Sequence, residues 1–274
     1  MSGDDTPRTT VVIPVWGRYV NSRFVAALES VTSQAQGGPV LIVDNASPEP
    51  PQPRGGARVI RSQRRVTLGA ARDLGLAQVQ TANVVFWDAD DLMPPGTLAF
   101  MQTQLEADPG LVAFGMALTE DPSGVRHRWP RRWIARLIRF PLALALLNSI
   151  WSVYPANGAV IMRTSAVRAC GAHADTPTGD ERSLGASLLF RGRVGWSERT
   201  GCIYLRHPGS NSDARMNIRI KLANAAQVRA RLRADPAVPG WVGRSLPLIA
   251  VAQWAAVAAH LVVAAARRLT ASKR

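Results

Sequence analysis

Residues 84–91 read Val84-Val85-Phe86-Trp87-Asp88-Ala89-Asp90-Asp91, an apolar run that ends in three carboxylates. β-Branched and aromatic residues in a run of this length are typical of a central strand. In open α/β sheets, ligands bind at the carboxyl ends of the strands, which is where these acids would lie. The stretch therefore predicts a buried strand that brings negative charge to a ligand site.

The three carboxylates have two interpretations. Acids this close repel one another when ionised, which favours a divalent cation, donor groups of a ligand or a shared proton as their partner. Hard cations such as Mg²⁺ and Mn²⁺ are bound by one or two carboxylates together with phosphate oxygens. The alternative is a solvated acidic turn ahead of a helix that begins after Pro94-Pro95.

The segments around this strand alternate between strand and helix patterns. Strands are expected at about 9–15, 39–43, 58–60, 84–87, 111–116 and 159–162, and a further strand is expected to end at 204–208. Helices are expected at about 19–33, 69–80, 97–107, 179–190 and 214–234. Such alternation indicates βαβ units. The predicted fold is therefore α/β, with a mostly parallel, Rossmann-like sheet flanked by helices.

The composition sets limits on size and partners. A chain of 274 residues can form one large domain, or one domain with an appendage. The net charge is +14, and only Lys221 and Lys273 among the 33 basic residues are lysines. Excess arginine favours phosphates, anionic lipids or nucleic acids as partners. Cys170 and Cys202 have no metal-binding or redox spacing, and the first eight residues have no apolar signal segment, so the expected location is cytoplasmic.

Five segments, in this order, resemble glycosyltransferase family 2, whose members are inverting enzymes with the GT-A fold. They are Val12-Ile13-Pro14-Val15-Trp16-Gly17-Arg18, Val43-Asp44-Asn45-Ala46-Ser47, Gly69-Ala70-Ala71-Arg72-Asp73-Leu74-Gly75, Trp87-Asp88-Ala89-Asp90-Asp91 and Gly179-Asp180-Glu181-Arg182-Ser183-Leu184. The chain departs from the family's usual Tyr-Asn at Trp16-Gly17, from its usual Asn at Asp73, and from its usual order of acids at Asp180-Glu181. The resemblance covers about residues 9–212.

The resemblance implies a donor site for a nucleotide sugar. The residues that it places there are Pro14, Asp44, Arg72, Asp88, Asp91 and Arg206. It implies a metal cofactor, Mn²⁺ or Mg²⁺, which would offset the charge of the departing nucleoside diphosphate. The metal residues would be Asp90, Asp88 and His207. Structural alternatives remain open: an Asx-turn at Asp44, a surface position for Arg72 and a loop hydrogen bond for His207.

Inversion in a single displacement requires a base that deprotonates the acceptor hydroxyl. By resemblance the catalytic candidates are Asp180 and Glu181. Glu181 occupies the catalytic position when counted back from Leu184, while Asp180 has the usual side-chain length. The alternative is that both acids only complement the dipole at a helix N-terminus.

Two segments have the composition of membrane-surface elements. In the segment 126–149, six arginines surround Trp129, Trp133 and several aliphatic residues, a combination that suits an anionic membrane. The stretch 246–266 is apolar except for Gln253 and His260. It is long enough to span a bilayer, but its polar residues favour a helix that lies on the membrane or packs against the core. We therefore expect a catalytic domain at 1–235 and a tail at 236–274, peripheral on the inner face of the plasma membrane.

The leading hypothesis is a metal-dependent, inverting glycosyltransferase that uses a UDP-, GDP- or dTDP-sugar and a lipid-linked or envelope-glycan acceptor. One alternative is a nucleotidyltransferase of sugar phosphates, but such enzymes carry a glycine-rich, lysine-containing phosphate loop near the first strand, which is missing here. The other is a nucleic-acid-binding protein, suggested by charge alone. In such a protein the basic residues should alternate with exposed aromatics over a continuous surface, whereas here they cluster beside apolar faces.

Overall fold

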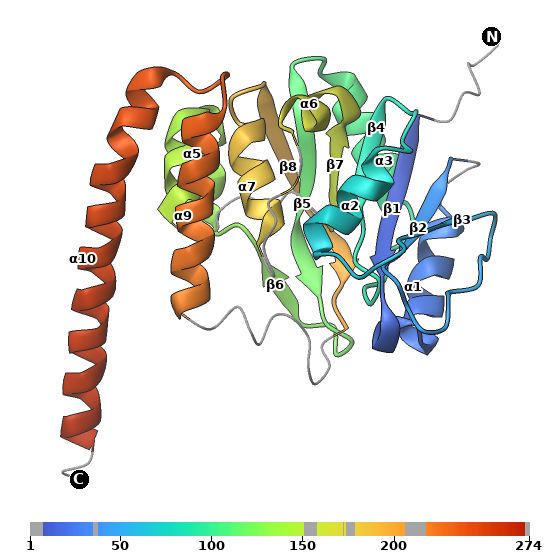
Figure 1. Cartoon of the computed structure of the whole chain (residues 1–274), viewed down its shortest axis with the longest axis horizontal. Coiled ribbons are helices and arrows are strands. Elements are labelled where there is room, and N and C mark those ends of the chain that lie inside the picture. Colours follow the sequence, from blue (N-terminus) through green and yellow to red (C-terminus); the bar gives the residue numbers. More distant parts are fainter. Residues whose placement is uncertain are drawn as a thin grey trace.

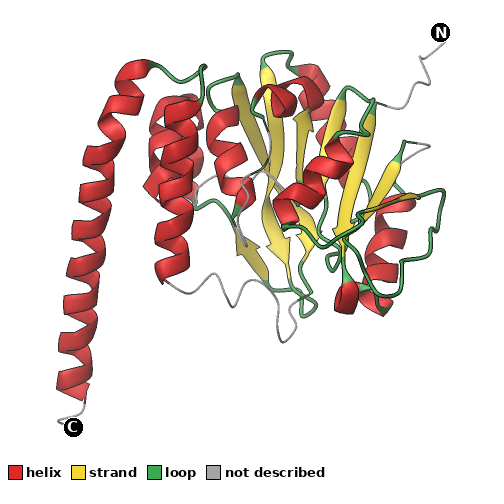
Figure 2. Cartoon of the chain, in the orientation of Figure 1, coloured by secondary structure: helices red, strands yellow, loops and turns green. Residues whose placement is uncertain are grey.

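A computed structural model describes residues 8–34, 38–150, 158–171, 173, 179–205 and 218–271 (Figure 1). Figure 2 shows a central sheet with helices on both faces and further helices standing at one end of it. The predicted α/β class with flanking helices is confirmed.

The described residues form one eight-stranded sheet, in the order β3-β2-β1-β4-β7-β5-β6, with β8 along β5. The strands are β1 (Thr9–Val15), β2 (Val40–Asp44), β3 (Arg58–Arg61), β4 (Asn83–Phe86), β5 (Leu111–Glu120), β6 (Arg126–Arg128), β7 (Val160–Arg163) and β8 (Arg193–Ile203). β1 to β4 pair in parallel, as expected. β7 runs antiparallel to β4 and β5, and β6 is antiparallel to β5, so the sheet as a whole is mixed.

Helices connect and cover these strands. The described α-helices are α1 (Ser22–Thr32), α2 (Leu68–Leu76), α3 (Thr97–Ala107), α4 (Arg132–Ala135), α5 (Pro141–Ile150), α6 (Thr164–Ala169), α7 (Asp180–Leu188), α9 (Ile218–Ala234) and α10 (Gly240–Ala271). Two short 3-10 helices, η1 (Gly17–Tyr19) and η2 (Arg136–Arg139), follow β1 and α4.

Alternate residues of the central strands enter two separate cores. Val12 of β1 and Phe86 of β4 pack with α2, α6 and α7, whereas Val11 and Val85 pack with α1 and α3. Successive side chains of a strand point to opposite faces of the sheet. All four residues are at most 1% exposed, so both strands are buried on both faces. This double burial explains their continuous apolar sequence.

The parallel strands β1, β2 and β4 end at the same edge of the sheet. Their register pairs Val12 with Phe86 and Val15 with Asp44. The acids at 88–91 follow β4 directly, as the sequence predicted.

Helices α5, α9 and α10 form a layer at one end of the sheet (Figure 1). Val242 and Leu246 of α10 are fully buried in a cluster with Val228 and Leu232 of α9. The first half of α10 is therefore packed against the rest of the chain. Within the described residues, no helix combines the length and apolar character that crossing a membrane requires.

The arginine-rich segment 126–149 does not form one continuous helix. It begins with the strand β6 and continues through α4, η2 and α5. Of its apolar residues, Ile134 is buried but Trp133 is 53% exposed. The segment therefore packs on the core through part of its apolar side chains and leaves an aromatic side chain at the surface.

Candidate active site

Three acids follow β4 and differ in exposure. The side chain of Asp88 is 34% exposed, Asp90 is half-buried and Asp91 is buried. Asp91 accepts a hydrogen bond from the backbone N–H of Leu205, with an N–O distance of 3.3 Å. Burial and then the charges of Asp88 and Asp90 raise the pKa of Asp91 well above its ordinary value. Asp88 and Asp90 are therefore the more accessible acids of this edge, whereas Asp91 joins it to the end of β8.

The edge of the sheet that carries Asp88, Asp90 and Asp91 is called the acid edge below. Arg72 on α2 joins this acid edge to α7. Its Nη2 donates to Oδ1 of Asp88 at 2.8 Å, and its Nη1 donates to Oδ2 of Asp180 at 2.6 Å. The side chains of Arg72 and Asp180 are each 1% exposed. Burial opposes ionisation of both groups, but their mutual attraction raises the pKa of Arg72 and lowers that of Asp180. The surface position considered for Arg72 is therefore wrong.

Helix α7 begins with the two acids predicted as catalytic. Gly179 precedes it with a φ of +82°, and a Cβ atom there would lie 2.4 Å from Nδ2 of Asn224. Only glycine satisfies both restrictions at low cost. Asp180 is fully buried, whereas Glu181 is half-buried. The first turn of α7 thus presents one acid to the interior and one that is partly accessible.

Asp44, at the end of β2, is held by two contacts. Its Oδ2 accepts from Nη1 of Arg61 at 2.5 Å, and its Oδ1 accepts from the backbone N–H of Ser47 at 2.9 Å. The second contact reaches three residues along the chain, one more than in the Asx-turn considered as an alternative. Pro14 lies beside Val43 in the register of β1 with β2. Both predicted donor residues therefore lie near the edge where β1 and β2 end, and their roles toward a nucleotide stay predictions.

Sequence reasoning missed several residues around this edge. Arg61 was not identified, although it contacts Asp44. Arg65 stacks on Trp16, with its Cζ 3.5 Å from the ring centroid. The sequence feature that could have pointed to this contact is Trp16, which stands where the family usually has Tyr. His173 was also missed: it binds Asp73, the residue that replaces the usual Asn.

Arg206 and His207 lie outside the described residues. Within the described ranges, no three His, Cys, Asp or Glu side chains gather into a ready metal site. A Mg²⁺ or Mn²⁺ ion needs only one or two carboxylates when phosphate oxygens complete its coordination. Asp88 and Asp90 supply such oxygens at the strand end. The donor set therefore fits a cation that binds together with a diphosphate.

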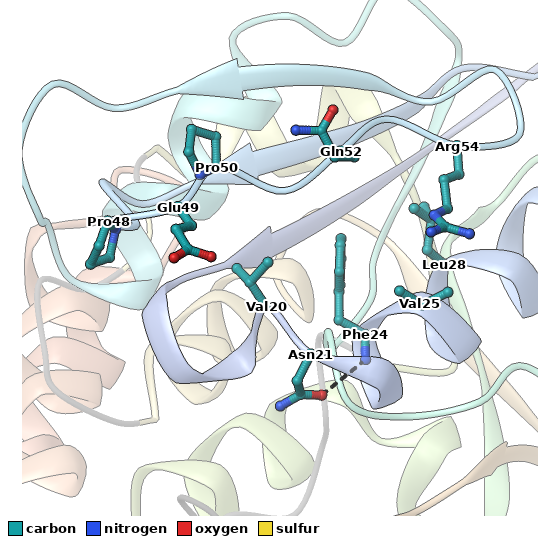
Figure 3. A pocket seen from close by; sticks show the side chains of 10 residues that line it. All are labelled: Val20, Asn21, Phe24, Val25, Leu28, Pro48, Glu49, Pro50, Gln52 and Arg54. Carbon is teal, nitrogen blue, oxygen red and sulfur yellow. Dashed lines mark hydrogen bonds between the residues drawn. The ribbon is translucent and has the colours of Figure 1, made fainter.

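A separate pocket of about 530 Å³ lies between α1 and the loop that follows β2 (Figure 3). Its lining residues are Val20, Asn21, Phe24, Val25, Leu28, Pro48, Glu49, Pro50, Gln52 and Arg54. None of the predicted site residues belongs to this set. The pocket is therefore distinct from the acid edge.

This mixed sheet with flanking helices matches the GT-A fold of solved glycosyltransferases. Three solved structures illustrate the likeness. S. aureus TarS 1–349 in complex with UDP-GlcNAc is 12% identical, with a TM-score of 0.66, and the match covers 90% of this chain and 72% of that one. The mannosyltransferase PcManGT from Pyrobaculum calidifontis, in complex with GDP-Man and Mn²⁺, is 19% identical, with a TM-score of 0.60 and coverages of 99% and 82%.

The third is glucosyl-3-phosphoglycerate synthase from Mycobacterium tuberculosis, in complex with Mn²⁺, UDP and glucosyl-3-phosphoglycerate. It is 18% identical, with a TM-score of 0.56 and coverages of 85% and 81%. At such identities these matches establish the fold. The family model "Glycosyl transferase family 2" matches residues 10–168, more than half of the chain. The chain belongs to glycosyl transferase family 2 and is a glycosyltransferase. No curated protein sequence matches it.

Proposed function

We propose that the chain is an inverting, metal-dependent enzyme that moves a sugar from a nucleoside diphosphate to a hydroxyl group of an acceptor. One observation supports this proposal most: the buried side chain of Arg72 binds both Asp88 and Asp180. The guanidinium thereby couples the edge that would hold the donor to the helix that would carry the base. Family membership does not favour the nucleotidyltransferase or nucleic-acid alternatives.

The donor would lie along the ends of β1, β2 and β4. Asp90 and Asp88 would hold the cation, with His207 as a further ligand. The cation, when bound, offsets the charge of the leaving diphosphate. Arg206 would bind phosphate oxygens. Asp44 would accept a hydrogen bond from the nucleotide base, for which Arg61 now competes. Because Arg61 is 46% exposed at its side chain, it can move aside when a nucleotide binds.

Glu181 is the better candidate for the base. Asp180 is fully buried and bound to Arg72, so its charge serves to hold that arginine. Glu181 is half-buried in the same turn of α7. A general base must reach the proton that it abstracts, which favours the more accessible acid. We therefore assign proton abstraction to Glu181 and positioning to Asp180.

Donors of the nucleoside diphosphate sugar class are supported by the ligands of similar structures. Those proteins were solved with UDP-GlcNAc, with GDP-Man and Mn²⁺, or with UDP and Mn²⁺. The base and the sugar differ among them. We propose a UDP-, GDP- or dTDP-sugar as donor and Mn²⁺ or Mg²⁺ as cofactor.

We further propose that the enzyme works at the inner membrane face on a lipid-linked or envelope-glycan acceptor. Trp133 and Phe140 are more than half exposed, and Arg132, Arg136 and Arg139 are exposed beside them. On α10, Leu248 and Trp254 are more than half exposed, whereas Leu246 is buried. Exposed aromatics beside arginines suit the interface of an anionic bilayer. In this proposal residues 1–235 are the catalytic domain and 236–274 a tail that assists attachment.

A donor screen tests the catalytic proposal. The purified chain is incubated with UDP-, GDP- and dTDP-sugars, with Mn²⁺ or with EDTA, and release of the nucleoside diphosphate is measured. We expect metal-dependent hydrolysis of at least one donor. If no nucleotide sugar is hydrolysed and none raises the Tm in the presence of Mn²⁺, the proposed donor class is wrong.

A further inference from the structure

An Asp–His pair with a buried imidazole lies beside the Arg72 bridge. Asp73, the neighbour of Arg72 on α2, accepts from the backbone N–H of His173 at 2.8 Å, and its Oδ1 lies 2.5 Å from the ring Nδ1. A carboxylate can only accept, so the Nδ1 atom carries the proton. The carboxylate of Asp73 thus fixes both the backbone and the ring of His173.

The imidazole of His173 is buried against the end of β4. Its side chain is 1% exposed, and its ring meets Phe86 edge-on, with centroids 4.8 Å apart. Phe86 is the last residue of β4, two positions before Asp88. Nε2 is buried and has no hydrogen-bond partner among the described residues. His173 therefore connects α2 to the end of the strand that delivers the acids.

The pair is also linked to the base-bearing helix. Arg72, the neighbour of Asp73 on α2, binds Asp180, the first residue of α7, at 2.6 Å. Burial raises the pKa of Asp180, whereas Arg72 and then His173 lower it. The imidazole is therefore within electrostatic range of this acid.

We propose that Asp73 and His173 form a positioning pair that fixes α2, and with it Arg72, against the end of β4, and so holds the two acids of α7 in their catalytic arrangement. The inference rests on the proposed function, because it assigns the base to α7. It concerns Asp73, which stands where the family that the sequence resembles usually has Asn. The pair acts through α7 and does not contact the substrate.

Two measurements test the pair, each on the full-length chain. The first is kcat and KM for hydrolysis of the donor that the wild type hydrolyses fastest. The second is hydrogen exchange of peptides that cover the first turn of α7. The variants are Asp73→Ala, His173→Ala, their combination and Asp73→Asn. The matched control is Asp121→Ala with His127→Ala, an exposed Asp–His pair in the β5–β6 hairpin.

We expect kcat to fall about 10- to 100-fold in each Ala variant, the usual effect of displaced supporting groups, while the donor KM stays within about twofold. The double variant should be no worse than the single ones, because residues that act as a unit are not additive. Exchange should rise in the first turn of α7. Asp73→Asn should retain more activity than Asp73→Ala, because its amide oxygen can still accept from the His173 backbone.

Unchanged kcat in folded Ala variants would overturn the proposal. It would also be overturned if exchange rose throughout the protein and kcat fell only in proportion to the folded fraction, because the pair would then be purely stabilising. If the wild type hydrolyses no donor, the proposed function fails, and the exchange measurement alone decides: unchanged exchange at α7 contradicts the pair's positioning role.

Discussion

Arg72 and Asp180 form a buried ion pair across 108 positions of sequence, with Nη1 and Oδ2 2.6 Å apart. The other guanidinium nitrogen binds Asp88, which is half-exposed at the acid edge. A planar guanidinium can hold two carboxylates in fixed directions, which an ammonium cannot do. Arg72 therefore sets the distance between the acid edge and α7.

Removing Arg72 should destabilise the protein strongly. Arg72→Ala leaves the fully buried Asp180 without its cation, and breaking a buried pair in this way costs about 3–5 kcal/mol of the free energy of unfolding. Urea denaturation measures the loss, and Arg23→Ala, an exposed arginine of α1, is the control. A loss below 1 kcal/mol for Arg72→Ala would contradict the buried pair.

Substitutions of the two acids of α7 should differ in their effect on stability. Glu181→Gln should lower kcat about 10²- to 10⁴-fold, the usual contribution of a general base, with little change in the donor KM or in Tm. Asp180→Asn should lower Tm, because it weakens the pair with Arg72. Steady-state kinetics and thermal denaturation of both variants give the comparison. Near-normal turnover of Glu181→Gln would show that the base lies elsewhere.

Much of the fold follows from local sequence patterns. Strands β1, β2 and β4 are buried on both faces and therefore read as continuous apolar runs, so their positions and the acid edge could be predicted. Strand β8 was expected to end at 204–208 and its start was not predicted, whereas it spans Arg193–Ile203. Its central residues Glu198 and Arg199 are exposed, so its sequence lacks the apolar pattern that indicates a strand.

The long-range contacts of the site could not be predicted. The motifs place Arg72 on a helix near the donor, but no spacing in the sequence shows that Asp88 and Asp180 meet on its guanidinium. The pairing of Asp73 with His173 spans 100 positions and depends on how α2 packs against β4. Such contacts arise from tertiary packing, on which local propensity carries no information.

Both cysteines should be unreactive in the folded protein. Burial raises the pKa of Cys170 to about 11 and that of Cys202 well above its ordinary value. Since the thiolate is the reactive form, a raised pKa leaves both as thiols near pH 8, and the thiolate fraction grows only as the pH rises. Ellman's reagent should label neither thiol in native protein and both in guanidinium chloride. Rapid labelling of the native protein would contradict this burial.

Membrane attachment should have a salt-sensitive and a salt-resistant part. Leu248→Ser with Trp254→Ser should reduce binding to anionic vesicles at all salt concentrations, because burial of apolar side chains is not screened. Arg132→Gln with Arg136→Gln should reduce it mainly at low salt, because exposed charges are screened beyond about 8–10 Å at physiological ionic strength.

Vesicle flotation measures both effects, with Leu74→Ser, an exposed leucine of α2, as the control. Point variants suit this test better than removal of α10, whose residues Val242 and Leu246 are buried. If the unmodified chain does not float with anionic vesicles even at low salt, the exposed residues of α10 and the arginine segment serve another contact.

The most direct test of the account is the metal dependence of nucleotide binding in Asp90→Ala. Mn²⁺ should raise the Tm of the unmodified protein in the presence of the nucleoside diphosphate of its donor, since a ligand that binds only the folded state stabilises it. Glu29→Ala, which removes an exposed acid of α1, should behave as the unmodified protein does. We predict that Asp90→Ala keeps its fold and loses the Mn²⁺-dependent increase. An undiminished increase in Asp90→Ala would contradict the assignment of the cation, and with it the diphosphate, to the edge that follows β4.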